Sequence, residues 1–242
     1  VIFALRAGGE HGAGLFAAAL SLVTPAYLLP RAISVVLFPA MARAAGRFDA
    51  ARVRLHLKVG TQVLAAALLP VFALAAILAP SVLTLAYGRD FADGATTLVV
   101  MVWATWVSVA SVPAVNALSS DTGRGYVIPA VASVAGFLVG LGWWIAGGTS
   151  IESVAWGYLA GSVVQSAVPM IRAARRYGVP GIGFGARVLA AAGLALAVSL
   201  LCGPLGIGVR IAIAIAVGAA AAVAVLPELR GLRRVMAERT LA

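Results

Sequence analysis

Seven long apolar stretches, separated by short charged or glycine- and proline-containing segments, most constrain how this chain folds. A helix needs roughly 20 apolar residues to cross a hydrocarbon layer about 30 Å thick. Of the 242 residues, 62% are hydrophobic and only 11% are charged, unlike soluble globular domains. The sequence therefore predicts an all-α, polytopic membrane protein with about seven transmembrane helices. The stretches cover residues 12–41, 59–86, 95–119, 126–146, 151–171, 188–203 and 211–226.

The distribution of basic residues predicts the orientation of these helices. Of 18 lysines and arginines, 14 fall in the segments after the first, third, fifth and seventh stretches, and three fall in the alternate segments. Basic residues accumulate in the cytoplasmic loops of membrane proteins, so we expect the N-terminus outside and the C-terminus in the cytoplasm. Topology thus explains the formal charge of +10, and the sequence predicts no nucleic acid partner.

The remaining basic residue, Arg31, lies inside the first apolar stretch, within TPAYLLPRAISVVLFPA at residues 24–40. An arginine at bilayer depth is costly unless it has a partner or faces water. Pro25 and Pro30 interrupt the same helix. A three-four-three spacing places four polar residues on one helix face, namely Thr24, Tyr27, Arg31 and Ser34. This polar stripe favours a face that lines a wet cavity or packs on protein, because lipid offers it no partner.

The acidic residues narrow the choice of partner for Arg31. All eight fall in loops, in the C-terminal tail or at the ends of apolar stretches, so no carboxylate of this chain is expected at bilayer depth. Arg31 then pairs with a carboxylate outside this sequence, with a lipid phosphate or with an anionic substrate, or its side chain reaches toward the nearer interface. The lack of buried acids disfavours a proton relay and favours an anionic cargo.

Other candidate chemistry is sparse. The single cysteine, Cys202, cannot form an intramolecular disulfide, and His11 and His56 lie far apart without ligand spacing. The sequence therefore predicts no metal site and no cofactor. An enzyme is disfavoured because the acids on the outer side, Asp90, Asp93 and Glu152, form no recognisable motif. Three polar residues within apolar stretches are expected to form hydrogen bonds between helices, namely Gln62, Asn116 and Gln165.

Two pairs of glycines predict close helix packing. Gly136 and Gly140 in GFLVG, and Gly157 and Gly161 in GYLAG, place small residues one helical turn apart. Small residues at this spacing let neighbouring helix backbones approach closely in membranes. Ordinary packing within the bundle is favoured over a dimerisation signal.

Several short motifs resemble the C-terminal half of the multidrug/oligosaccharidyl-lipid/polysaccharide exporter superfamily, and most closely its polysaccharide-biosynthesis flippases. They are a span ending in VLFPAMARA, a second span closing with LAPSVLTLAYGRDF, and a third ending near NALSSDTGRG. The resemblance covers roughly residues 12–176. Its landmarks are Phe38 with Pro39, Tyr87 with Gly88 and Phe91, and Gly123 with Arg124.

The resemblance implies a transporter of twelve to fourteen helices, built as two bundles around a central cavity and working by alternating access. Such flippases move undecaprenyl-pyrophosphate-linked oligosaccharides across the bacterial cytoplasmic membrane for cell-surface polysaccharide synthesis. In this interpretation, residues 1–11 end a preceding helix and form an outer loop, 12–176 form a bundle of five helices, and 177–242 add a helix pair and a basic cytoplasmic tail. The other half lies on the same chain or on a second chain.

The resemblance and the polar stripe meet at Arg31. Its planar guanidinium suits the oxygens of a pyrophosphate, and Tyr27 and Thr24 are positioned to contact sugar hydroxyls or the same phosphates. Ser34 completes the predicted substrate-binding set. Alternatives that the sequence leaves open are a lipid II flippase, a multidrug antiporter, a polyprenyl-phosphate sugar transferase or polymerase, and a membrane protein that does not transport.

Overall fold

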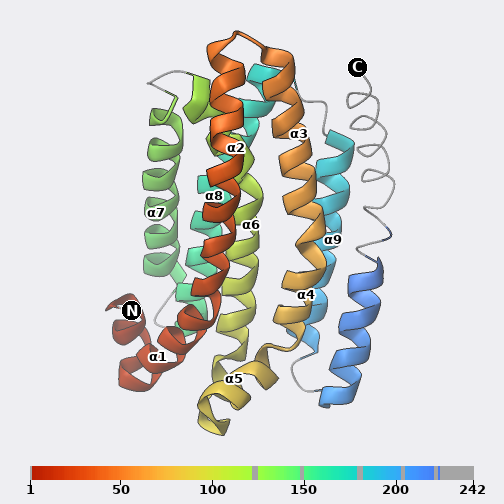
Figure 1. The fold of residues 1–242 in the computed structure, drawn as a ribbon. Helices are drawn as coiled ribbons and strands as arrows, with labels where there is room; N and C mark the ends of the chain where they lie inside the picture. Colours follow the sequence, from red (N-terminus) through yellow and green to blue (C-terminus); the bar gives the residue numbers. More distant parts are fainter. Residues whose placement is uncertain are drawn as a thin grey trace.

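A computed structural model describes residues 2–121, 125–147, 150–178, 182–202, 205–220 and 223, and the regular secondary structure of these residues is entirely helical. In chain order the elements are α1 (Ile2–Val23), the 3₁₀ helix η1 (Thr24–Tyr27), α2 (Leu28–Gly46), α3 (Ala50–Ala67), α4 (Leu69–Ile77), α5 (Ala79–Tyr87), the 3₁₀ helix η2 (Arg89–Gly94), α6 (Ala95–Asp121), α7 (Val127–Gly147), α8 (Ile151–Tyr177) and α9 (Ile182–Leu201). A further helix spans Ile207–Ala220. Most of the long helices run alongside one another in a single elongated bundle (Figure 1).

The prediction of an all-helical protein is confirmed, but the predicted number of about seven spans is not reached within the described residues. Four helical segments are long and apolar enough to cross a membrane, namely Ile2–Gly46, Arg89–Ser120, Val127–Gly147 and Ile151–Tyr177. The bent pair of α4 and α5 makes a fifth if it is counted as one span. The last two apolar helices, Arg187–Leu201 and Ile207–Ala220, are shorter.

The second predicted span, 59–86, is divided among the end of α3, α4 and most of α5. The chain breaks at Leu68 and again at Leu78, and α5 is inclined by 63° to α4. Pro70 and Pro80 lie in the first turns of α4 and α5. Proline has no N–H to donate and clashes with the preceding turn, so each proline starts a helix. As a result, α5 turns away from the bundle axis (Figure 1).

The first predicted span, 12–41, contains one interruption, and the helix that leads into it contains another. Within α1 the backbone leaves helical geometry at Gly8 and Gly9, where Gly9 has φ 63° and ψ −160°. This conformation is accessible to glycine and strained for other residues. The helix that leads into the span therefore bends at Gly9, where an outer loop reaching residue 11 was predicted. The second interruption is η1, which contains Pro25 and confirms the predicted break there. Pro30 was also predicted to interrupt the helix, but it lies in the first turn of α2, where a proline is tolerated, and the helix continues through it.

The predicted division of the chain can be compared with these elements. Residues 12–176 contain the part of α1 after its kink and the elements from η1 through nearly all of α8. The helix pair predicted after residue 177 corresponds in position to α9 and Ile207–Ala220. The predicted basic tail lies outside the described residues, as do two of the motif residues, Gly123 and Arg124.

Helix α6 forms the centre of the bundle. It contacts α1, α2, α3, α4, α8 and α9. In the most apolar part of the segment Arg89–Ser120, which contains nearly all of α6, 78% of the residues are buried, against 17% in the corresponding part of α7. Its buried side chains include Met101, Trp103 and Trp106, and the indole N–H of Trp106 donates to the carbonyl of Ala65 in α3. A helix with apolar residues on every side is suited to this central position.

The turn between α2 and α3 is compact because one helix cap follows directly on the other. The N–H of Phe48 donates to the carbonyl of Ala45, and the N–H of Asp49 donates to that of Ala44, each at 2.9 Å. This is a Schellman arrangement. The Asp49 carboxylate then accepts from the N–H of Arg52 at 3.0 Å and caps α3. Phe48 occupies the left-handed position, with φ 55°.

Replacing Phe48 with glycine is expected to stabilise the protein by about 1 kcal/mol, because the left-handed conformation costs a side chain that amount and glycine much less. The phenyl ring is 96% exposed, so little packing is lost. Unfolding in mild detergent would measure the change. The matched control is Phe48→Ala, which removes the ring and keeps the strained position, and it should change stability by less than about 0.5 kcal/mol. Equal stabilisation by both variants would contradict the strain argument.

Helices α7 and α8 pack with their backbones in contact. A Cβ atom added at Gly136 would lie 2.5 Å from the carbonyl oxygen of Gly161, and one added at Gly157 would lie 2.7 Å from that of Gly140. The two glycine pairs therefore face each other within one chain. This confirms the prediction of ordinary packing, and it explains why glycine is needed at these positions.

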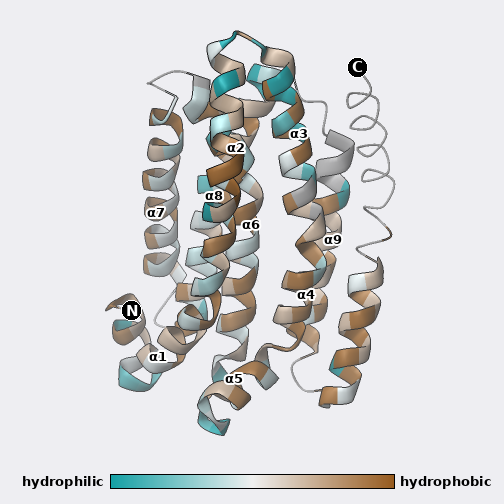
Figure 2. Ribbon diagram, viewed as in Figure 1, coloured by the Kyte–Doolittle hydropathy of each residue, from teal (hydrophilic) through white to brown (hydrophobic). Residues whose placement is uncertain are grey.

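The two ends of the bundle differ in polarity. The C-terminal ends of α2, α6 and α8 lie at one end, and the N-terminal ends of α6 and α8 lie at the other (Figure 1). Hydrophilic residues gather where α2 meets α3, whereas apolar residues occupy much of the length between the ends (Figure 2). We call the end with the α2–α3 turn the basic end, since it carries Arg43, Arg47 and Arg52.

Candidate functional site

Two of the four residues predicted as a polar stripe form contacts inside the bundle. The hydroxyl of Tyr27 shares a hydrogen bond with the hydroxyl of Tyr158 in α8. One end of the stripe is therefore tied to α8, a helix more than a hundred residues further along the chain. Tyr27 closes η1 and directly precedes α2, so this bond also fixes the junction of the two elements.

Ser34 is tied to the central helix. The side-chain amide of Asn116 in α6 donates to the hydroxyl of Ser34 at 3.0 Å. Asn116 is buried, and the pair satisfies polar groups that lipid cannot. The prediction that Asn116 forms a hydrogen bond between helices is confirmed. The hydroxyl of Ser34 is accordingly engaged with protein in this structure.

Thr24 is exposed, and its hydroxyl donates to the carbonyl of Leu20 at 2.7 Å. This bond lies within one segment of chain and links α1 to η1. It satisfies the hydroxyl donor, and the oxygen lone pairs of Thr24 remain able to accept a hydrogen bond.

Arg31 differs from the other three residues. It lies in the first turns of α2 and is exposed, and within the described residues its guanidinium makes no hydrogen bond or ion pair. At about 1.5 Å per residue, Arg31 lies roughly 18 Å along the helix from Arg43 at the basic end. It follows Tyr27, the last residue of η1, by four residues. The structure thus presents an unneutralised cation well inside an apolar segment.

A cavity of about 400 Å³ lies between α1, α7 and α8 and reaches α6. Its lining includes the aromatic residues Phe16, Phe137 and Trp144 and the polar residues Tyr158, Ser162 and Gln165. Because Tyr158 both lines the cavity and bonds to Tyr27, the cavity adjoins the polar stripe. The surface is mostly apolar with a few polar groups, a composition typical of small-molecule sites.

Sequence reasoning missed this cavity and the role of Tyr158. The available signal was a tyrosine within GYLAG, where the glycines indicated helix packing. The same glycines line the cavity, since Gly136, Gly140, Gly157 and Gly161 all border it. A residue without a side chain leaves open space wherever the neighbouring helix does not fill it. The same four glycines therefore account for both the close packing of α7 on α8 and the cavity beside it.

The described residues offer no cluster of three or more histidine, cysteine, aspartate or glutamate side chains that could hold a metal ion. Asp90 and Asp93 are exposed in η2, which joins α5 to the start of α6 at the end of the bundle opposite the basic end (Figure 1).

Comparison with known proteins gives no assignment. No protein-family model matches the chain, and no curated protein or solved structure is significantly similar to it.

Proposed function

We propose that this chain is part of a membrane flippase that moves an undecaprenyl-pyrophosphate-linked oligosaccharide across the bacterial cytoplasmic membrane. The observation that carries the proposal is Arg31, a cation inside an apolar segment with no acidic partner in the described part of the chain. A charge in that position is tolerated where it faces a wet cavity or binds an anion. A pyrophosphate supplies the anion, and the planar guanidinium can bind it through two parallel hydrogen bonds.

The neighbourhood of Arg31 supports a lipid-linked substrate. Thr24 and Tyr27 lie on the same segment. The lone pairs of Thr24 can accept a hydrogen bond from a sugar hydroxyl, and the Tyr27 hydroxyl, when it accepts from Tyr158, can donate to a sugar or phosphate oxygen. The cavity beside Tyr158 has aromatic and glycine walls and suits part of an apolar polyprenyl chain. Ser34 takes part through its lone pairs while Asn116 holds its position. The transport cavity itself is completed by a second bundle, on the same polypeptide or on another chain.

The proposed orientation puts the basic end in the cytoplasm and the N-terminus outside, because basic loops are retained on the cytoplasmic side. In a Cys202→Ala background, a membrane-impermeant maleimide should label Phe48→Cys in inside-out vesicles only. It should label Asp90→Cys in right-side-out vesicles only. Both wild-type side chains are exposed. The reverse labelling pattern would contradict the orientation.

The experiment that tests the function is the leaflet distribution of undecaprenyl-linked saccharides, measured by mass spectrometry in cells with and without the full-length protein. We expect the precursors to accumulate on the cytoplasmic leaflet of the deletion strain and to redistribute when the wild-type protein is restored. Lipid II is measured in the same samples, and its accumulation in place of the oligosaccharide would assign the lipid II flippase instead. Unchanged distributions of both would reject transport of either carrier.

A further inference from the structure

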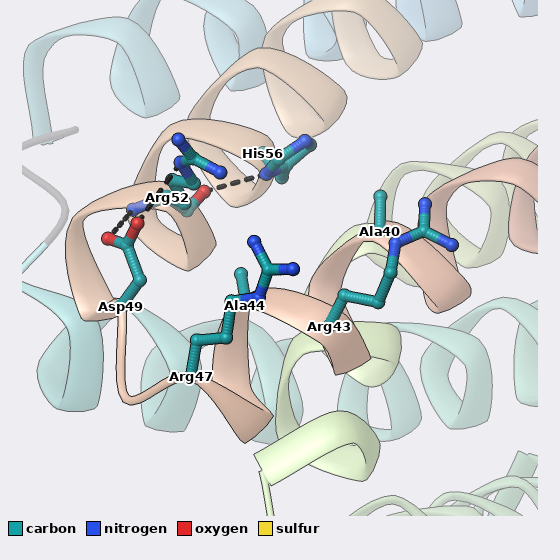
Figure 3. Close-up of a pocket in the computed structure, with 7 residues that line it drawn as sticks. All are labelled: Ala40, Arg43, Ala44, Arg47, Asp49, Arg52 and His56. Carbon is teal, nitrogen blue, oxygen red and sulfur yellow. Dashed lines mark hydrogen bonds and ion pairs between the residues drawn. The ribbon is translucent and has the colours of Figure 1, made fainter.

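A second group of arginines surrounds a pocket at the basic end. Arg43 extends from the last turn of α2 and Arg47 is the C-cap residue of that helix, while Arg52 and His56 extend from the first turns of α3 (Figure 3). Together with Ala40, Ala44 and Asp49, these side chains line a cavity of about 250 Å³. The compact turn at Phe48 holds the two helices in this arrangement.

The charges around this pocket are unbalanced. Its one acid, Asp49, is engaged twice, since it caps α3 and pairs with the guanidinium of Arg52 at 3.1 Å. The side chains of Arg43 and Arg47 form no hydrogen bond or ion pair with other described residues. Arg54 lies in the same part of α3, but its guanidinium donates a hydrogen bond to the carbonyl of Tyr177 at the end of α8. Two guanidinium groups therefore face the pocket without a counter-charge.

His56 adds a further polar group. Its Nδ1 lies 2.7 Å from the carbonyl oxygen of Arg52. A carbonyl accepts, so Nδ1 carries the proton, and this bond fixes the ring on the side of α3 that borders the pocket.

The size of the pocket fits a phosphate group and a small substituent. At roughly 30 Å³ per molecule of liquid water, 250 Å³ corresponds to about eight waters. One guanidinium group can donate two parallel hydrogen bonds to two oxygens of a phosphate. Two arginines one helical turn apart can therefore bind one phosphate from the same side. Arg43 and Arg47 are four residues apart and so lie on one face of α2.

We propose that the pocket between Arg43, Arg47 and His56 binds a phosphate group, carried by an anionic lipid headgroup or by a soluble phosphate. This inference is independent of the proposed transport function and of Arg31. The position at the basic end of a membrane protein allows both sources. A headgroup would come from the adjacent leaflet, where basic residues near the surface attract anionic lipids, and a soluble phosphate would come from the aqueous phase.

The test uses the full-length protein and two probes. Thermal unfolding in detergent is followed during titration with inorganic phosphate. In parallel, the protein is placed in nanodiscs of phosphatidylcholine alone or with one-fifth phosphatidylglycerol, and retained lipid is counted by native mass spectrometry. The variant is Arg43→Gln with Arg47→Gln. The matched control is Arg172→Gln with Arg175→Gln, which removes the same charge from exposed residues near the end of α8.

We expect the pocket variant to bind at least one probe about tenfold more weakly than wild type, as the loss of charge-assisted hydrogen bonds predicts, and the control to bind it as wild type does. A difference confined to phosphatidylglycerol assigns a lipid headgroup. A difference with inorganic phosphate assigns a soluble phosphate. Binding of neither probe by wild type, or equal weakening in variant and control, would overturn the proposal, since the effect would then be absent or due to net charge alone.

Discussion

Replacement of Gly161 with leucine is expected to drive α7 and α8 apart and to leave little folded protein. A Cβ atom at this position would lie 2.5 Å from the carbonyl oxygen of Gly136, and a backbone atom cannot rotate away as a side chain can. Overpacking of a core costs roughly 1–3 kcal/mol when side chains adjust, so we expect a loss of at least about 3 kcal/mol here. Recovery of monodisperse protein in detergent and its unfolding midpoint would measure the effect.

The matched control for this substitution is Gly142→Leu. Gly142 lies on α7, is exposed, and has no atom within 4 Å of an added Cβ. The control carries the same chemical change on the same helix pair and should fold like wild type. If Gly161→Leu and Gly142→Leu were equally stable, the close contact between α7 and α8 would not exist in the folded protein.

Arg31→Gln is expected to reduce transport of the lipid-linked oligosaccharide roughly tenfold or more while leaving the stability of the protein unchanged within about 0.5 kcal/mol. The transport loss follows if Arg31 binds the pyrophosphate. The unchanged stability follows because Arg31 is exposed and has no partner among the described residues. Arg31→Lys keeps the charge but loses the planar fork, so its transport should be intermediate. Leaflet distribution of the carrier and unfolding in detergent would be measured on the same variants.

The direction of the stability change separates the alternatives for Arg31. If the side chain faced lipid, removal of the charge would raise stability, because an arginine in hydrocarbon is costly. If it paired with a carboxylate from another part of the protein, glutamine would lower stability and leave that acid unpaired. Arg89→Gln is the control, since Arg89 lies exposed in η2 as the first residue of its candidate span. Normal transport by both Arg31 variants would remove Arg31 from the substrate site.

Features that depend on local spacing could be predicted from the sequence. The all-helical class follows from the length of the apolar stretches, and the α7–α8 contact follows from glycines one turn apart, because both depend on residues close in the chain. The break beside the polar stripe follows from Pro25 in the same way. A hydrogen bond from Asn116 to another helix could be predicted, since a lone amide in an apolar helix needs a partner. The sequence could not identify Ser34 as that partner.

Features that depend on how helices meet could not be predicted. Tyr27 and Tyr158 are joined although 131 residues separate them, and no pattern in either segment indicates the other. An ideal helix from Thr24 to Ser34 would place all four polar side chains on one face, in the same environment. The 3₁₀ turns of η1 alter that register, and the neighbours α6 and α8 then engage Ser34 and Tyr27 but leave Arg31 exposed. The basic pocket was missed because its residues were assigned to topology alone.

The backbone contact between α7 and α8 also limits how this protein can change shape. Helices that meet through long side chains can slide by switching rotamers, whereas two backbones held at van der Waals distance have no such freedom. Any rearrangement must therefore move α7 and α8 together as one rigid pair. A ligand that enters beside Tyr158 would then press on both helices at once, and the stiffness of that pair would transmit the motion along their whole length.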